Sequence, residues 1–293
     1  MAKVHLNGIG IHYQVFGKDP GPELVMIHGL AANLAFWFRL FTLVGSRFHI
    51  IAYDLRGHGY SDIVPSSYTT ADMAHDLGAL LDHLGVQKAH IVGHSFGGAV
   101  ALHFSLLYPE RVKTLTLADA RVFSLQPMTR RSDDDQLAAD WRRCVQELGV
   151  TVDEHLPYVA YSLIEEMARE RHSGRELQLL LSSSAGGVWT ASKRSWQRWR
   201  TLLETTTALA DLTDIAGLTE HSIRQNRGPV LAIYGEYSHC WPTCDRLIPL
   251  LAQCKKIIVP GVGHFYPAVR PEHLVKNLIG FIEHYNQHSS KAI

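Results

Sequence analysis

The run Gly93-His94-Ser95-Phe96-Gly97 constrains this chain more than any other segment, because it joins an apolar stretch to one rich in small residues. A serine flanked in this way is typical of a tight turn from a strand into a helix, which holds the hydroxyl away from the backbone. Such a turn is strained, and glycine relieves its crowding because it has no Cβ. The helix predicted over 97–107 directs its N-terminal N–H groups at the serine. The pattern therefore predicts a nucleophilic Ser95.

Apolar runs of strand length alternate with helical spacing on both sides of this turn. The hairpin signal Asn7-Gly8 separates the first two runs. The predicted strands cover residues 3–6, 9–15, 23–28, 49–53, 89–92, 112–117, 229–234 and 256–259. The predicted helices cover residues 70–84, 97–107, a segment from Pro242, and 271–285. This alternation predicts an α/β fold with right-handed crossovers around a mostly parallel sheet.

Residues 122–227 break the alternation, since they have amphipathic helical spacing and no strong strand signal. We therefore predict a core formed by 1–121 and 228–293, with a helical cap over 122–227. The inserted segment carries four of the six tryptophans, and two of them, Trp189 and Trp196, are candidates for the substrate pocket. Their spacing also fits packing within the cap, because Trp189, Trp196 and Trp199 fall on one helical face.

The charge balance argues against a polyanion as partner. Lys plus Arg and Asp plus Glu each total 28, which gives a formal net charge of zero and no nucleic-acid footprint. No stretch holds about 18 uninterrupted apolar residues, and the first residues show no signal-peptide pattern. We therefore expect a cytoplasmic protein that binds neither nucleic acid nor membranes. The oligomeric state is left open.

Two of the four cysteines, Cys240 and Cys244, lie close together with His239 beside them. The group suggests a metal or disulfide element, but the spacing lacks a second Cys or His pair. We therefore expect ordinary reduced thiols. No metal and no organic cofactor is predicted.

Four motifs in order make the chain resemble the α/β-hydrolase family. They are His28-Gly29-Leu30, the loop 54–62, the Ser95 turn, and Pro260-Gly261-Val262-Gly263-His264-Phe265. The resemblance spans the whole chain except the inserted segment. It implies an eight-stranded, mostly parallel sheet with helices on both faces and a helical cap inserted after the sixth strand.

The resemblance also implies site roles. The backbone N–H groups of Leu30 and Phe96 would form the oxyanion hole that an attack by Ser95 requires. His264, in a glycine-flanked loop after the last predicted strand, would serve as general base and then protonate the leaving group. His94 is a further candidate for the substrate pocket.

The triad acid departs from the commonest family pattern. Many relatives place an aspartate three residues after the glycine that ends the seventh strand, and here that position is Ser238, after Gly235. Asp119, just past the predicted strand 112–117, is our choice, because some branches of the family carry the acid after the sixth strand. Glu236 is the alternative.

A serine, a histidine and an acid with an oxyanion hole are typical of acyl transfer through an acyl-serine. We expect hydrolysis of a carboxylic ester or thioester of a small hydrophobic acyl group, including one linked to a carrier or to CoA. Hydrolysis of a carbon–carbon bond or a lactone uses nearly the same residues, and cofactor-free haloperoxidase activity is another family outcome. A different class, a non-catalytic small-molecule receptor, also fits the fold.

Overall fold

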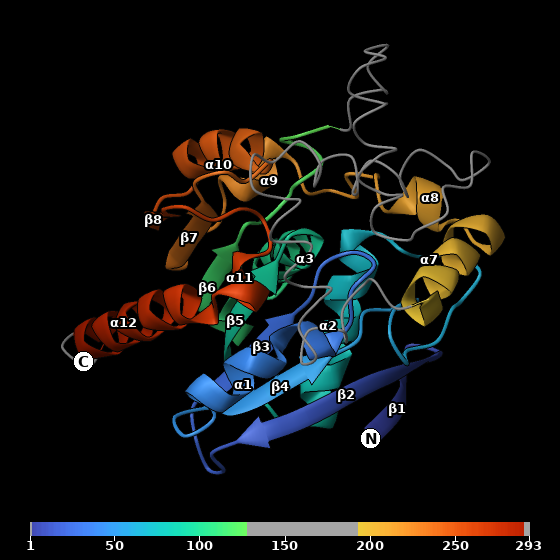
Figure 1. The fold of residues 1–293 in the computed structure, drawn as a ribbon, viewed down its shortest axis with the longest axis horizontal. Helices are drawn as coiled ribbons and strands as arrows, with labels where there is room; N and C mark the ends of the chain where they lie inside the picture. The colour runs from blue at the N-terminus through green and yellow to red at the C-terminus, as the bar shows by residue number, and fades with distance from the viewer. Residues whose placement is uncertain (1, 128–192, 290–293) are drawn as a thin grey trace.

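Eight strands form one sheet in the computed structural model, which describes residues 2–127 and 193–289 (Figure 1). Their order is β1-β2-β4-β3-β5-β6-β7-β8. β2 is antiparallel to both of its neighbours, and the remaining strands are parallel. The expected eight-stranded, mostly parallel sheet is therefore confirmed. The strands are β1 (Ala2–Leu6), β2 (Ile9–Gly17), β3 (Glu23–Ile27), β4 (His49–Tyr53), β5 (Ala89–His94), β6 (Val112–Ala118), β7 (Val230–Gly235) and β8 (Cys254–Val259).

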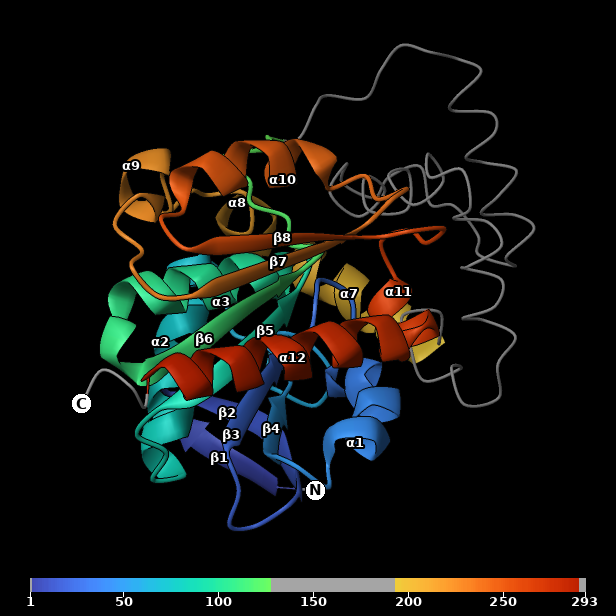
Figure 2. The ribbon, with the colours of Figure 1, turned by 90° about the vertical axis from the view of Figure 1, so that its left-hand side faces the viewer.

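Helices cover both faces of the sheet (Figure 2). One face carries α2, α3 and α10, and the other carries α1, α11 and α12. No helix in the described part of the chain is long and apolar enough to cross a membrane. The α-helices are α1 (Phe38–Val44), α2 (Thr70–His83), α3 (Phe96–Leu107), α7 (Lys193–Thr205), α8 (Ala208–Asp211), α9 (Glu220–Ile223), α10 (Trp241–Leu247), α11 (Tyr266–Val269) and α12 (Pro271–Ser289).

The central strands are continuous apolar runs because both of their faces are buried. In β3, Val25 and Ile27 belong to the core cluster under α2 and α3, whereas Leu24 and Met26 belong to the cluster under α1 and α12. All four side chains are inaccessible to solvent. Burial on both faces is the usual state of a parallel strand flanked by helices.

The three strands that carry the candidate site end together at one edge of the sheet. His94 at the end of β5 pairs with Ala118 at the end of β6, and Ala118 pairs with Ile233 in β7. The loops that follow these strands therefore meet at the carboxyl edge, which is where ligands bind in open α/β sheets.

The predicted elements agree with the observed ones to within a few residues. The hairpin between β1 and β2 is confirmed, with Asn7 and Gly8 at φ of 52° and 78°. The spacing of residues 34–44 did not predict α1, because six of the first eight residues from Leu34 are aromatic or leucine and show no polar face. The local signal for this segment is Asn33, whose side chain accepts a hydrogen bond from the Ala35 N–H.

The predicted cap lies only partly within the described residues. Residues 128–192, which include Trp189, are outside them, so the cap boundaries stay a prediction. The described remainder contains α7, α8 and α9, between β6 and β7. In α7, Trp199 is 2% exposed and its ring centroid lies 5.5 Å from that of His58. Trp199 therefore packs on the loop after β4.

A buried ion pair ties this loop to α2. Arg56 donates from Nε and Nη2 to the two carboxylate oxygens of Asp76, both at 2.7 Å, and both side chains are buried. A bidentate pair of this kind is among the stronger polar contacts in proteins. Loss of one partner would leave the other charge unpaired in the core.

We expect Asp76→Ala to lower the free energy of unfolding by about 3–5 kcal/mol, because the Arg56 guanidinium would stay buried without its carboxylate. The matched control is Glu283→Ala, which removes the partner of Arg47 in a pair whose side chains are both 56% exposed. That variant should cost under about 1 kcal/mol. Urea denaturation measures both, and equal losses would contradict the prediction.

Several histidines are held neutral inside the fold. Burial lowers the pKa of His58 and of His94 to about 3, and burial beside Lys113 lowers that of His90 to about 4. The ordinary value in an unfolded chain is about 6.5. At pH values between the folded-state pKa and the unfolded-state pKa, these histidines bind protons in the unfolded chain but not in the folded one. The free energy of unfolding therefore falls as the pH falls.

Each such histidine should reduce stability by up to about 1.4 kcal/mol per pH unit below about pH 6.5. Urea denaturation between pH 7.5 and about pH 5 should therefore show a steep loss of stability. His90→Asn removes one titrating group at Thr114, away from the Ser95 turn, and should make the slope shallower by about one proton. A slope unchanged in this variant would show that His90 is not neutral in the folded protein.

Candidate active site

Ser95 stands in the strained turn that its motif predicts. It lies between β5 and α3 with φ of 55° and ψ of −124°, in a region that L residues rarely adopt. A Cβ on Gly97 would lie 2.3 Å from the carbonyl oxygen of His28, and one on Gly93 would lie 2.3 Å from that of Gly97. Glycine is therefore required on both sides of Ser95, as the motif indicates.

A second strained turn, after β6, is hydrogen-bonded to the first. Asp119 also has a positive φ, of 51°. Ser95 N–H donates to the carbonyl oxygen of Ala118 at 3.2 Å, and Arg121 N–H donates to that of Ser95 at 3.0 Å. The main chain itself therefore sets the position of Asp119 relative to Ser95.

The loop after β3 lies directly against the nucleophile. A Cβ on Gly29 would lie 3.0 Å from the Cβ of Ser95. His28 fixes this loop, because its Nδ1 donates to the Gly29 carbonyl at 2.7 Å while its Nε2 accepts from the Leu55 N–H at 3.1 Å. Complete burial lowers the pKa of His28, which keeps this neutral tautomer at physiological pH.

The two predicted oxyanion donors flank this contact. Leu30 follows Gly29, and Phe96 follows Ser95 at the N-terminus of α3. Neither backbone N–H donates to an acceptor among the described residues. Such groups are available to a ligand oxygen, as an oxyanion hole requires.

His264 and Asp119 are brought together from distant parts of the chain. The Nδ1 of His264 lies 3.7 Å from the Oδ1 of Asp119, and both side chains are completely buried. This distance is within ion-pair range and longer than a hydrogen bond, which is common for catalytic contacts without substrate. Burial lowers the pKa of His264 well below its ordinary value, with further contributions from His239 and His94. His264 is therefore a neutral imidazole, the form that accepts a proton.

The carboxylate of Asp119 is oriented by two donors from the segment after β7. Gly235 N–H donates to Oδ2 at 2.9 Å, and the Ser238 hydroxyl donates to Oδ1. The Ser238 oxygen in turn accepts from the Cys240 N–H at 3.0 Å. This role of Ser238 was not predicted from the sequence. The available signal was its position three residues after Gly235, where many relatives carry the acid.

Glu236, the alternative acid, has a different partner. Its side chain is exposed, and Oε2 accepts a hydrogen bond from the Gly261 N–H at 2.8 Å. The carboxylate therefore holds the turn after β8 and is not oriented by the donors that hold Asp119. The geometry favours Asp119 as the acid.

His94 lies below the site. It is 1% exposed, its ring stacks on Phe36 at 4.5 Å between centroids, and its Nε2 donates to the carbonyl oxygen of His264 at 2.9 Å. Through these contacts His94 supports the His264 loop, and the pocket role predicted for His94 stays a prediction. Trp189 is outside the described residues, and Trp196 lies in α7 with its side chain outside them, so their pocket roles stay predictions.

Comparison with known proteins identifies the fold family. Residues 22–271 match the family model of the alpha/beta hydrolase fold. RutD of Variovorax paradoxus (strain S110), a proposed carbamate hydrolase, is 38% identical over 112 residues, which cover 38% of this chain and 42% of RutD. The chain thus matches less than half the length of this curated relative.

Two solved structures superpose over nearly the whole chain. Est816, described as an N-acyl homoserine lactone degrading enzyme, gives a TM-score of 0.72 at 23% identity, covering 96% of this chain and 100% of Est816. The enol-lactonase from Burkholderia xenovorans LB400 gives 0.70 at 17% identity, with coverages of 96% and 100%. Likeness at these identities supports the fold alone. The family match over residues 22–271 shows that the chain belongs to the α/β-hydrolase fold family.

Proposed function

We propose that the protein is a serine hydrolase that cleaves a carboxylic ester or thioester of a small hydrophobic acyl substrate through an acyl-serine on Ser95. The observation that carries this proposal is the meeting of the strained Ser95 turn, two available N–H groups and the buried His264–Asp119 pair at one sheet edge. Similar proteins described as lactone-, ester- or carbamate-cleaving enzymes support acyl chemistry.

The proposed reaction has two halves. Ser95 Oγ attacks the carbonyl carbon while His264 takes the hydroxyl proton, and the developing oxyanion binds the N–H groups of Leu30 and Phe96. Collapse expels the alcohol or thiol, which leaves with the proton that His264 held. Water then attacks the acyl-serine, His264 takes its proton, and the acid is released as the proton returns to Ser95.

Asp119 orients the base in this scheme. Its Oδ1 faces the Nδ1 of His264, so it favours the tautomer in which Nε2 carries the free lone pair. The carboxylate also stabilises the imidazolium that forms in each half-reaction. The Gly235 N–H and the Ser238 hydroxyl hold it in place during this change of charge.

Lactone hydrolysis is a second candidate, favoured by the names of Est816 and the enol-lactonase. The same residues would serve, with the ring oxygen as the leaving group. The acyl substrate is free or linked to a carrier or CoA, and the scheme uses no metal, organic cofactor, nucleic acid or membrane. If Ser95 does not react with a serine-directed reagent, a non-catalytic small-molecule receptor is the alternative.

The first test is intact-mass analysis after treatment with a fluorophosphonate. We expect a single adduct on the wild type, because Ser95 is activated by His264 and its adduct oxygen enters the oxyanion hole. Ser95→Ala should give no adduct. A wild type that stays unmodified would contradict the proposed serine chemistry and favour a receptor.

The second test separates the candidate acids. We expect Asp119→Asn to lower kcat on an ester substrate by about 10⁴, because the amide orients the imidazole in the wrong tautomer. Glu236→Gln should stay within a few-fold of wild type, since its side chain holds only the Gly261 turn. The measurement is steady-state hydrolysis of short-chain p-nitrophenyl esters.

Ser238→Ala is an informative companion, because it keeps the carboxylate and removes one donor to it. Its loss in kcat should be intermediate, about tenfold, comparable to about 1.4 kcal/mol for one hydrogen bond to a charged group. The reverse order, with Glu236→Gln the most damaging variant, would overturn the assignment of Asp119.

A further inference from the structure

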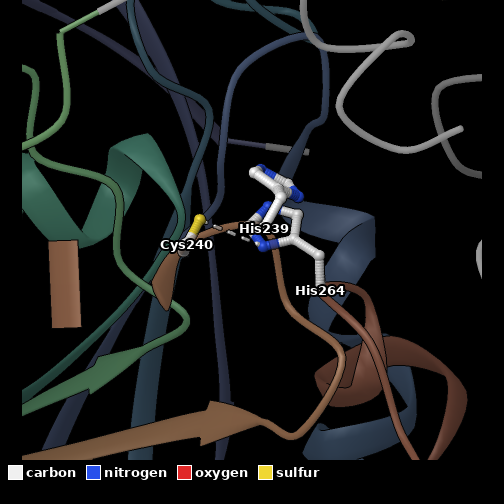
Figure 3. A group of neighbouring side chains, drawn as sticks. All are labelled: His239, Cys240 and His264. Atoms are coloured by element: carbon white, nitrogen blue, oxygen red, sulfur yellow. Dashed lines mark hydrogen bonds between the residues drawn. The ribbon is translucent and has the colours of Figure 1, made fainter. Parts of the chain in front are cut away.

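His239, Cys240 and His264 point toward one another beside the proposed triad (Figure 3). The first two follow β7 and begin the turn into α10, and His264 stands in the loop after β8. One ligand atom from each of the three lies within 4.8 Å of the others. The sequence showed only the His239-Cys240 pair, and the fold supplies the third donor.

The distance between two of these donors matches a metal site. Cys240 Sγ lies 3.6 Å from His264 Nδ1. In a tetrahedral zinc site with Zn–S of about 2.3 Å and Zn–N of about 2.05 Å, the sulfur and nitrogen are about 3.6 Å apart. The two atoms, which contact each other in a side chain–side chain hydrogen bond, therefore have the separation of two ligands of one zinc ion.

The third donor lies close to the other two. The ring of His239 lies 4.3 Å from that of His264 between centroids, at 52°. Its side chain is partly exposed, whereas Cys240 and His264 are buried. Of the three side chains, that of His239 is therefore the nearest to solvent.

We propose that His239, Cys240 and His264 form a binding site for a thiophilic divalent cation such as Zn²⁺, and that the bound cation inhibits the enzyme. One thiolate and two imidazoles are a donor set that zinc prefers, with a water in the fourth position. On binding, the Cys240 thiol loses its proton to solvent and a metal–sulfur bond forms. The inhibition rests on the proposed function, and the binding does not.

A cation at this site would inhibit the enzyme because it would bind the His264 nitrogen that faces the triad acid. The nitrogen of His264 that faces Cys240 Sγ also faces Asp119 Oδ1, at 3.7 Å. A cation on this nitrogen displaces the proton that orients the ring on Asp119, and the single ring proton of the neutral imidazole moves to Nε2. Because Nε2 then has no free lone pair, the imidazole no longer accepts a proton from Ser95.

The binding test is a Co²⁺ titration of the purified full-length chain, followed by absorption. We expect a thiolate-to-cobalt charge-transfer band that saturates at one Co²⁺ per chain and disappears when Zn²⁺ is added. Cys240→Ser should abolish the band, and His239→Asn should weaken Co²⁺ binding at least tenfold, since even residues behind the ligands contribute about 10–100-fold. Cys254→Ser is the matched control, a partly buried cysteine in β8 outside the cluster, and should bind Co²⁺ like wild type.

Absence of the band in wild type, or its persistence in Cys240→Ser, would overturn the site. The functional arm measures the rate of fluorophosphonate labelling of Ser95 with and without Zn²⁺. Labelling of wild type should slow at Zn²⁺ concentrations that leave His239→Asn reactive, and a chelator should restore it. Unchanged labelling of the Zn²⁺-bound protein would overturn the inhibition. A metal-free wild type that is not labelled would count against the serine chemistry, while the cobalt spectrum still decides the metal site.

Discussion

Two main-chain hydrogen bonds between the turn at Ser95 and the turn at Asp119 are the constraint around which the site is built. Both residues hold a positive φ, which costs on the order of 1–3 kcal/mol for a residue with a Cβ. The bonds from Ser95 N–H to Ala118 and from Arg121 N–H to Ser95 make each turn a support for the other. Because these contacts are between backbones, the spacing of the two turns does not depend on any side-chain rotamer. The oxyanion loop and the His264 loop are then arranged against this fixed pair.

Because the candidate acid follows β6, the segment after β7 has a different role from the one it has in many relatives, where it carries the acid. In this chain that segment supplies donors in place of a carboxylate: the Gly235 N–H and the Ser238 hydroxyl both bind Asp119. The Cys240 N–H continues the series by donating to Ser238. A hydroxyl is well suited here, because it donates to the carboxylate while it accepts from the backbone. The end of β7 thus still belongs to the triad, as support for the acid.

Much of this arrangement could be predicted from the sequence, because its signals are local. The central strands were found because each is a short run buried on both faces, as in β3, and the first hairpin because Asn7-Gly8 fits a turn with two positive φ values. Ser95 and His264 stood in short motifs that describe their own turns. The helix α1 gave no such signal, because it is short and begins with the apolar but exposed Phe38. Its buried residues Leu40, Phe41 and Val44 belong to the core cluster that α12 also joins.

The contacts of Ser238, His94 and Cys240 could not be predicted, for a different reason. Each depends on which strands are neighbours in the sheet and on how the loops after them cross. Ser238 meets Asp119 across 119 positions of sequence, and His94 meets the His264 carbonyl across 170. A one-residue change in the register of β6 against β7 would turn Asp119 to the opposite face and separate it from Ser238. Pairings of this kind become visible only when the sheet order is known.

The burial that makes His264 a good base also makes it a good ligand. Exclusion of water keeps its imidazole neutral and strengthens the oxyanion hydrogen bonds, because fixed dipoles act more strongly at low dielectric. A metal ion needs the same neutral imidazole, although it would use the lone pair of Nδ1 whereas the base uses that of Nε2. The ligand atoms of His239, Cys240 and His264 all lie within 4.8 Å of one another. Proton transfer and metal binding therefore compete for one ring. Cys240 favours metal binding in this competition, because without its sulfur the two histidines alone form only a weak metal site. Catalysis, in contrast, needs the His264 ring free to exchange protons.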